Sequence, residues 1–398
     1  MESSVHSRAV FFVGGYDPKS PSALFKRLER EHRRSAALWD AESTVGTAVV
    51  DPGGEWATAL IEAKGPGWST QTRFTTLLLD PIVLADFAKP LPVRIGKYLR
   101  ALADLVLSGT AFRIFRHAWR FGCYFLFPFA CLVLYALIGA LAGTLAARWT
   151  NALIGLALAV LIFFGLARWL GQRWPANHLM DLWSFSRDFM RGRRPDAEAQ
   201  LDRFTAHITE TLRAKPCDEV LLVGHSTGAL LMLDLAARCL KRDPDFARRA
   251  RHVSLLTLGS TALKAGLHPA AGKFRADMQR LAADPHLEWV EIQCMTDIIN
   301  FHRSEPGRLM GLTPAANKPF PLVRNIYLKE MMDRDAYKRI RRSFFRVHYQ
   351  YVSGNTRRYF YDWFLVCCGP VALGNRMRMK QADLVRRPEG QAPSEHAA

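Results

Sequence analysis

A serine flanked by glycines is the pattern in this chain that most clearly indicates a reactive side chain. The segment Gly224–Gly228 has the sequence Gly-His-Ser-Thr-Gly, after the apolar run Glu219–Val223 and before the apolar helical run Ala229–Leu240. Glycines two positions either side of Ser226 let the backbone turn tightly, because they have no Cβ to clash. A serine at a strand-to-helix turn is exposed above the sheet, and the helix N-terminus favours a developing oxyanion. The pattern predicts that Ser226 is a nucleophile; an ordinary glycine-rich turn is the alternative.

On these residues, and on the α/β segments around them, the chain resembles the α/β-hydrolase superfamily. The five residues at the turn carry the resemblance most sharply. In that superfamily the chain order is nucleophile, acid, histidine, with the acid after a later strand and the histidine after the last one. The resemblance implies a serine hydrolase with a Ser-His-Asp triad and an acyl-enzyme route.

Asp297 and His348 occupy the acid and histidine positions of this order. Asp297 follows the predicted strand Leu287–Met295, and His348 follows the predicted strand Leu322–Leu328 and a basic helical stretch. A structural aspartate that caps a loop is the alternative for Asp297. We expect His348 to lie within hydrogen-bond reach of both Asp297 and Ser226, where it would act as the base.

Two other histidines compete with His348. His302 comes shortly after Asp297, with no strand between them, so the superfamily order disfavours it. His225 is adjacent to Ser226, and adjacent residues on a tight turn point in different directions. A core or surface histidine is the alternative for His348.

An oxyanion intermediate needs prearranged N–H donors. The residue after the nucleophile, Thr227, is expected to supply one from its backbone. The superfamily takes the other from the loop after an earlier strand, and here Val13–Asp17 resembles that loop. The second donor would be Gly15 or Tyr16, although Gly14 stands where that loop often has histidine.

The elements that must position these residues alternate between strand-like and helix-like segments, which predicts an α/β fold with a largely parallel sheet and flanking helices. The expected strands are Ala9–Val13, Thr44–Val50, Trp56–Glu62, Phe74–Leu79, Glu219–Val223, Val253–Leu258, Leu287–Met295 and Leu322–Leu328. The expected helices are Ser22–Trp39, Ala197–Ala214, Ala229–Leu240 and Phe274–Ala282.

Two long uncharged stretches interrupt this alternation. Residues 121–147 carry no charge, which exceeds the roughly 20 residues that a membrane-spanning helix needs, and residues 149–167 come close to it. They predict a transmembrane hairpin with helices at about 121–147 and 149–170. A buried helical hairpin in a soluble domain is the alternative, but such helices seldom run so long without a polar face. Small residues where the helices could approach closely are Gly139, Gly143 and Gly155.

Charge around the hairpin predicts its orientation. Cytoplasmic flanks of membrane helices are rich in Lys and Arg. The linker offers only Arg148, whereas both flanks are basic: Arg94, Lys97, Arg100, Arg113, Arg116 and Arg120 precede the hairpin, and Arg168, Arg173, Arg187, Arg191, Arg193 and Arg194 follow it. We therefore expect a multi-pass protein of the inner, cytoplasmic membrane, with its catalytic domain facing the cytoplasm and the linker 148–151 outside.

Strand-like segments on both sides make the hairpin an insertion within one α/β domain. The predicted organisation is an N-terminal part at 1–82, a membrane-proximal insertion at 83–195, a C-terminal part at 196–386 and a disordered polar tail at 387–398.

The composition of the chain indicates which classes of binding partner and cofactor to expect. The formal net charge of +18 indicates an anionic surface, either lipid or nucleic acid. No zinc-finger spacing or RNP-type strand is present, and topology already explains many arginines, so we expect membrane lipids and no nucleic acid. The seven scattered cysteines show no metal-ligand spacing and imply no disulfide framework, and no cofactor or metal is expected.

These observations predict a membrane-anchored serine esterase or lipase-like enzyme. A lipid or acyl ester is the expected substrate, because the insertion occupies a place where the superfamily often carries a lid. An acyltransferase with the same triad and a non-catalytic membrane scaffold with this fold are the alternatives.

Overall fold

A computed structural model describes residues 4–315, 318–379 and 381. The predicted tail at 387–398 lies outside the described residues. The chain divides into two compact units. We call Met1–Val83, Pro195–Leu267 and Ala271–Ala398 the sheet unit, and Leu84–Arg194 with His268–Ala270 the helical unit.

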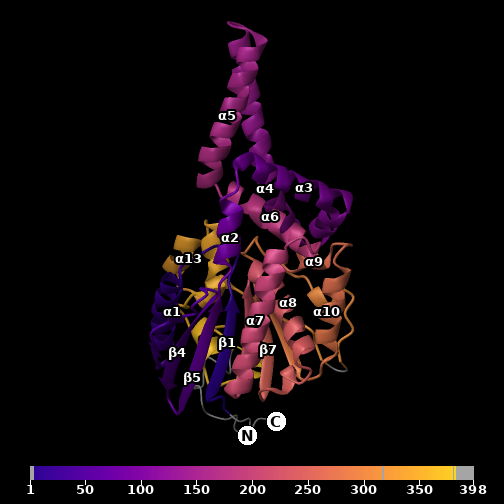
Figure 1. Cartoon of the computed structure of the whole chain (residues 1–398). Coiled ribbons are helices and arrows are strands. Elements are labelled where there is room, and N and C mark those ends of the chain that lie inside the picture. Colours follow the sequence, from indigo (N-terminus) through magenta and orange to yellow (C-terminus); the bar gives the residue numbers. More distant parts are fainter. Residues whose placement is uncertain (1–3, 316–317, 380, 382–398) are drawn as a thin grey trace. The chain divides into compact units, whose positions relative to one another are not determined.

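A nine-stranded, mostly parallel sheet forms the centre of the sheet unit, in the order β2-β4-β5-β1-β6-β7-β8-β9 with β3 beside β4 (Figure 1). Strands β5, β1, β6, β7, β8 and β9 run parallel to their neighbours in this set, and β2, β3 and β4 form an antiparallel edge. The predicted α/β class with a mostly parallel sheet is therefore confirmed. The strands are β1 Ser7–Val13, β2 Glu42–Val45, β3 Val49–Val50, β4 Trp56–Gly65, β5 Trp68–Leu77, β6 Glu219–His225, β7 His252–Leu258, β8 Leu287–Cys294 and β9 Leu322–Ile326.

Two strands differ most from their predicted ranges, while the ends of the other strands agree with prediction to within three residues. The predicted strand Thr44–Val50 is two short strands, interrupted where the Gly46 N–H donates to Leu60 O at 2.8 Å. Strand β5 begins at Trp68, before the predicted start at Phe74. Its first half alternates buried and exposed residues, and only its last four residues, Phe74–Leu77, are buried without interruption.

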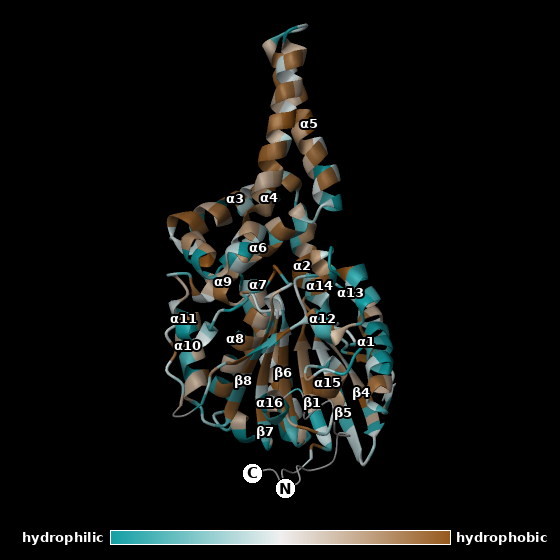
Figure 2. Ribbon diagram, turned by 180° about the vertical axis from the view of Figure 1, so that it is seen from behind, coloured by the Kyte–Doolittle hydropathy of each residue, from teal (hydrophilic) through white to brown (hydrophobic). Residues whose placement is uncertain are grey.

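Helices cover both faces of the sheet. Helices α7 and α8 lie in front of it in Figure 1, where α8 packs on β1, β6 and β7; the view from behind in Figure 2 shows α15 and α16, and α15 packs on β1, β4 and β5. The alternation along β1 follows these layers, because Phe11 meets His207 of α7 whereas Phe12 meets Trp363 of α15. The helices of the sheet unit are α1 Pro21–Ala36, α7 Pro195–Ala214, α8 Thr227–Arg242, α9 Leu263–Gly266, α10 Gly272–Ala283, α11 Pro306–Leu309, α12 Leu328–Met331, α13 Arg334–Ile340, α14 Phe344–His348, α15 Trp363–Cys368 and α16 Leu373–Arg378.

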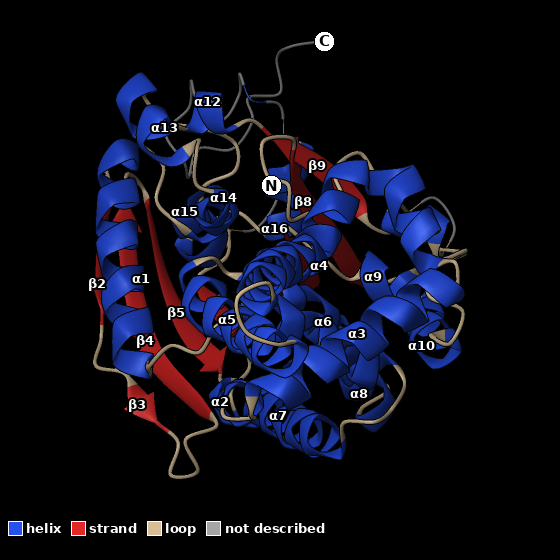
Figure 3. Ribbon diagram, turned by 90° about the horizontal axis from the view of Figure 1, so that it is seen from above, coloured by secondary structure: helices blue, strands red, loops and turns tan. Residues whose placement is uncertain are grey.

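The helical unit contains the predicted apolar hairpin. After α2 (Asp80–Phe87), which begins in the sheet unit, come α3 Leu91–Leu107, α4 Thr110–Ala147, α5 Ala152–Arg173 and α6 Ala176–Met190. Helices α4 and α5 pack along each other, as the view along the hairpin in Figure 3 shows, and hydrophobic residues cover much of both (Figure 2). Both helices are long and apolar enough to cross a membrane by length and composition.

Small residues bring these two helices together, as predicted. A Cβ on Gly143 would lie 2.4 Å from Gly155 O, and one on Gly155 would lie 2.6 Å from Gly143 O. A Cβ on Gly139 would lie 2.6 Å from Ala159 O. The backbones therefore approach too closely for any larger side chain at these positions.

Candidate active site

Ser226 stands at the junction of β6 and α8, in a backbone conformation that is unusual for a residue with a side chain. Every residue of β6 is buried, and α8 begins at Thr227. Ser226 has φ 61° and ψ −122°, and its N–H donates to Leu258 O at the end of β7 at 2.9 Å. Such strained backbone persists where the surrounding structure enforces it, and it clusters at functional sites.

The two glycines of the motif make this turn possible. A Cβ on Gly224 would lie 2.5 Å from Ala229 Cα. A Cβ on Gly228 would lie 2.2 Å from Gly14 O and 2.3 Å from Val13 O. Helix α8 therefore packs directly against the end of β1, and the turn has no room for alanine at either position.

The same packing places the predicted oxyanion loop beside Ser226. A Cβ on Gly15 would lie 3.5 Å from Ser226 Cβ and 3.8 Å from Ser226 Oγ, so Gly15 borders the serine side chain. Tyr16, the other predicted donor of this loop, is buried. Thr227 is the buried first residue of α8, so its N–H belongs to a helix N-terminus.

A buried lysine contacts this end of α8. Lys264 Nζ donates to Thr227 Oγ1 at 3.1 Å, and only 2% of Lys264 is exposed. Burial lowers its pKa to about 7. The sequence analysis did not identify Lys264, because nothing in a single lysine between short apolar residues marks it as buried.

Asp297 lies just after β8 with both carboxylate oxygens hydrogen-bonded. Oδ2 accepts from His348 Nδ1 at 2.7 Å and from the Tyr351 hydroxyl at 3.2 Å, while Oδ1 accepts from the Ile299 N–H at 2.8 Å. Burial, followed by the nearby Asp297 carboxylate, raises the pKa of Tyr351 well above its usual value, so this hydroxyl remains a donor. The structure thus brings the predicted acid and the favoured histidine together, while His302 lies half-buried in the loop after β8.

His348 ends α14 and is buried, with 4% exposure. Since a carboxylate can only accept, Nδ1 carries the hydrogen of this bond. Nε2 has no hydrogen-bond partner within the described residues. The hydrogen bond expected between Nε2 and Ser226 Oγ is therefore absent from this structure, and Nε2 is a buried ring nitrogen without a partner among the described residues.

Gly259, at the end of β7, connects the serine side of the site to the histidine side. Its φ is 51°, and a Cβ there would lie 2.6 Å from Tyr351 Cε2 and 3.0 Å from His348 Cε1. The preceding residue, Leu258, accepts the hydrogen bond from the Ser226 N–H. Consecutive residues of one strand end thus contact Ser226 and His348.

His225 holds His348 from the opposite side. Its Nε2 lies 2.9 Å from His348 O, to which it must donate, and the two rings are stacked obliquely with centroids 4.6 Å apart. Burial, and then the neighbouring His348, lowers the pKa of His225 well below its usual value, so the ring is neutral. This supporting position of His225 depends on a contact with a residue far away in the sequence, so no local pattern predicts it.

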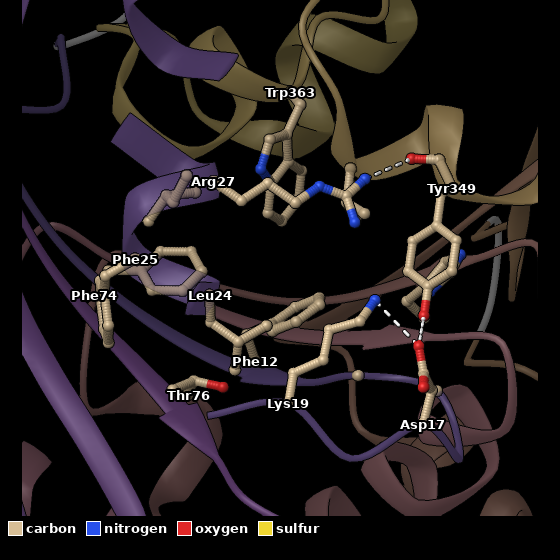
Figure 4. A pocket seen from close by; sticks show the side chains of 15 residues that line it. Phe12, Asp17, Lys19, Leu24, Phe25, Arg27, Phe74, Thr76, Tyr349 and Trp363 are labelled. Atoms are coloured by element: carbon tan, nitrogen blue, oxygen red, sulfur yellow. Dashed lines mark hydrogen bonds and ion pairs between the residues drawn. The ribbon is translucent and has the colours of Figure 1, made fainter. Parts of the chain in front are cut away.

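A cavity opens beside these residues within the sheet unit. It holds about 610 Å³ of empty space, part of it open to solvent, and Gly15 and His225 form part of its wall. Figure 4 shows aromatic and aliphatic side chains at one end, and Lys19, Asp17 and Tyr349 at the other, with Arg27 reaching toward Tyr349. Its lining residues are Phe12, Gly14, Gly15, Asp17, Lys19, Leu24, Phe25, Arg27, Leu28, Phe74, Thr76, His225, Tyr349, Val352 and Trp363.

Metal chemistry has no visible support in residues 4–315, 318–379 and 381, where no three His, Cys, Asp or Glu side chains come together to hold an ion. The seven cysteines are all free. The site itself contains the hydroxyl of Ser226, the imidazole of His348 and the carboxylate of Asp297. No family model matches the sequence, and neither a curated protein nor a solved structure matches the chain.

Proposed function

We propose that the protein is a serine hydrolase of the α/β-hydrolase type that cleaves an ester through an acyl-enzyme. The observation that carries this proposal is the combination of Ser226 at φ 61° on a strand-to-helix turn with a buried His348–Asp297 pair near it. The free Nε2 of His348 supports a base role, because a base must have an unoccupied lone pair.

In the proposed reaction, Ser226 Oγ attacks the ester carbonyl carbon while His348 Nε2 takes the hydroxyl proton. The carbonyl oxygen becomes an oxyanion, bound by the N–H of Thr227 and that of Gly15 or Tyr16. The C–O bond to the alcohol then breaks, and the alcohol leaves with the proton from His348. Water next attacks the acyl-enzyme, giving its proton to His348, and the acid departs as Ser226 Oγ recovers that proton.

Asp297 and its neighbours act on the imidazole in this scheme. The Asp297 carboxylate fixes the Nδ1–H tautomer and stabilises the imidazolium that forms during attack. The Tyr351 hydroxyl and the Ile299 N–H hold that carboxylate in place, and His225 holds the His348 backbone.

Hydrolysis of 4-nitrophenyl butanoate by the full chain in a neutral detergent tests the proposal. Ser226→Ala should abolish release of 4-nitrophenol, and His348→Ala should do nearly the same. Ser254→Ala is a matched control, because Ser254 is a buried serine on neighbouring β7 and its Oγ has no partner among the described residues. Equal rates for wild type and Ser226→Ala would overturn the proposal. Transfer of the butanoyl group to an added alcohol faster than to water would indicate an acyltransferase instead.

We further propose that α4 and α5 anchor the protein in the cytoplasmic membrane. Helix α5 has 22 residues and would extend about 33 Å, enough for a hydrocarbon core of about 30 Å. Large apolar side chains are exposed along both helices, among them Leu137, Leu141, Leu153 and Leu161. The basic flanks support a cytoplasmic location for both long ends. A cysteine placed at Thr150 should react only with reagents added outside, and labelling of the C-terminus from outside would contradict this topology.

A further inference from the structure

The cavity beside Ser226 has two chemically different ends. One end is built from Phe12, Leu24, Phe25, Phe74 and Trp363, in tilted and edge-to-face ring contacts (Figure 4). These five side chains are apolar, so this end suits an alkyl or acyl chain.

The other end carries two cations around one aromatic ring. Lys19 Nζ lies 3.9 Å and Arg27 Cζ 4.7 Å from the centre of the Tyr349 ring. Asp17, whose carboxylate accepts from the Tyr349 hydroxyl, is 2.9 Å from Lys19 Nζ and offsets one positive charge. Of the charged residues that line this end, Lys19 and Arg27 are positive and Asp17 is negative.

Arg27 has two carboxylates near it, those of Glu31 and Asp17, but neither lies at ion-pair distance. Its guanidinium donates to Ser353 Oγ at 2.9 Å and to Tyr349 O at 3.4 Å, both of which are neutral acceptors. Within the described residues, no carboxylate lies at ion-pair distance from Arg27. Burial lowers the pKa of Arg27, although an arginine remains charged at neutral pH. A partly buried cation with donors to spare, on the wall of an apolar cavity, is a site for an anionic oxygen group.

We propose that the substrate hydrolysed at Ser226 is an amphiphilic ester. Its apolar chain binds in the aromatic end of the cavity. Its anionic oxygen group, a phosphate or a carboxylate, is bound by Arg27 and Lys19. This inference rests on the proposed function for the assignment of the reacting bond. Gly15 borders the Ser226 side chain and lines the same cavity as Arg27 and Lys19, so one bound ligand can contact both the serine and the cations. A phosphate-bearing acyl ester has this chemistry, and so does an acyl ester that carries a carboxylate.

Binding of non-hydrolysable ligands to the Ser226→Ala protein tests the site without requiring catalysis. The ligands are hexyl phosphate, hexanoate, hexan-1-ol and inorganic phosphate, measured by calorimetry in a neutral detergent. We expect one or both of the amphiphilic anions to bind about 10-fold or more tightly than hexan-1-ol and than inorganic phosphate. The stronger of the two anions identifies the phosphate or the carboxylate as the natural group.

Substitution of Arg27 then assigns the contact. Arg27→Met should weaken the preferred anion by about 10- to 100-fold and change hexan-1-ol by less than about 3-fold. Arg27→Lys should recover most of the anion affinity. Arg34→Met is the matched control, because Arg34 is an exposed arginine on the same helix α1 and should leave every affinity unchanged. Equal losses for hexan-1-ol and the anion in Arg27→Met, or no loss for the anion, would overturn the inference.

The outcomes also separate this inference from the proposed function. Selective anion binding that depends on Arg27, in a protein that hydrolyses no ester, would leave the site intact and remove the hydrolase proposal. Ester hydrolysis that depends on Ser226, with hexan-1-ol bound as tightly as the anions, would keep the hydrolase and remove the anionic substrate.

Discussion

The serine and the histidine of the candidate site are held in place by different means. Backbone packing fixes Ser226, since β6 leads into it, α8 leaves it, and Gly224 and Gly228 lie against atoms that leave no space for a side chain. His348 lies at the end of a short helix, far from the serine in sequence, and side chains hold it. Asp297 binds its ring and His225 binds its backbone carbonyl.

This difference indicates where each half of the site is vulnerable. A backbone turn is distorted, and activity is lost, when a substitution adds an atom for which there is no space. A histidine held by side chains loses its position when a hydrogen-bonding group of a partner is removed, even if the volume of that partner side chain stays the same. The substitutions below follow this comparison from the largest expected loss of activity to the smallest.

Asp297→Asn should cause the largest loss on the histidine side. Asparagine keeps the shape but can present an N–H to Nδ1, which favours the wrong imidazole tautomer and removes the charge that stabilises the imidazolium. The value of kcat/KM should fall by about 10⁴-fold, as in other Ser-His-Asp sites, with little change in folding. Steady-state ester hydrolysis measures this loss. A loss below about 10-fold would show that Asp297 is only a loop cap.

Gly228→Ala should break the serine side. Its Cβ would lie 2.2 Å from Gly14 O, so α8 or the Gly14–Gly15 loop must shift, and both border Ser226. A shift of about 1 Å can cost about 100-fold in rate, and overpacking costs about 1 to 3 kcal/mol in stability. Gly272→Ala in α10 is the control, because a Cβ there meets nothing within 4 Å. Full activity in Gly228→Ala would contradict the close packing of the turn.

His225→Phe should have an intermediate effect. Phenylalanine keeps an aromatic ring against His348 but loses the donor to His348 O, leaving a buried carbonyl without its partner. A loss of about 10-fold in kcat, with KM nearly unchanged, is expected from the cost of one such hydrogen bond. His225→Gln, which can donate to the same oxygen, should recover part of the rate. Equal rates for the two variants would exclude the hydrogen bond as the cause.

Lys264→Met should have the smallest effect on activity, because the backbone and not the Lys264–Thr227 contact holds the turn. We expect a change in kcat/KM of less than about 3-fold at pH 8. Such a change corresponds to less free energy than the net contribution of one hydrogen bond.

Stability of the same variant depends on pH. In the folded state the pKa of Lys264 is lowered from 10.5 to about 7, so below pH 7 the protein folds with a buried charge, and this cost declines as pH rises from 7 toward 10.5. Lys264→Met removes the titration. The gain in the free energy of unfolding of Lys264→Met over wild type should therefore be about 2 to 3 kcal/mol larger at pH 6 than at pH 9, that is, the variant is more stabilised at pH 6. Urea unfolding at the two pH values checks this, and a difference independent of pH would contradict the burial of a titrating lysine.

The same contrast explains what the sequence could predict. The turn at Ser226 is local, so its glycines, the strand before it and the helix after it are all visible in one short segment, as is the apolar hairpin. The antiparallel start of β5 was not predicted, because its exposed polar residues leave no continuous apolar run in the sequence. Pairing with β4 stabilises this part of the strand. His225 and Tyr351 as supports of His348 and Asp297, Lys264 beneath Thr227, and Arg27 in the cavity wall depend on contacts between distant segments. No spacing in the sequence indicates them.

We propose above that the hydroxyl of Ser226 is activated for attack on a carbonyl. The most direct measurement is the labelling of wild-type membranes with a fluorophosphonate probe, followed by mass spectrometry of the modified peptide. The account predicts one adduct on Ser226, absent in Ser226→Ala, strongly reduced in His348→Ala and retained in His302→Ala. Equal labelling of wild type and Ser226→Ala, or a wild-type protein that is folded and remains unlabelled, would contradict it.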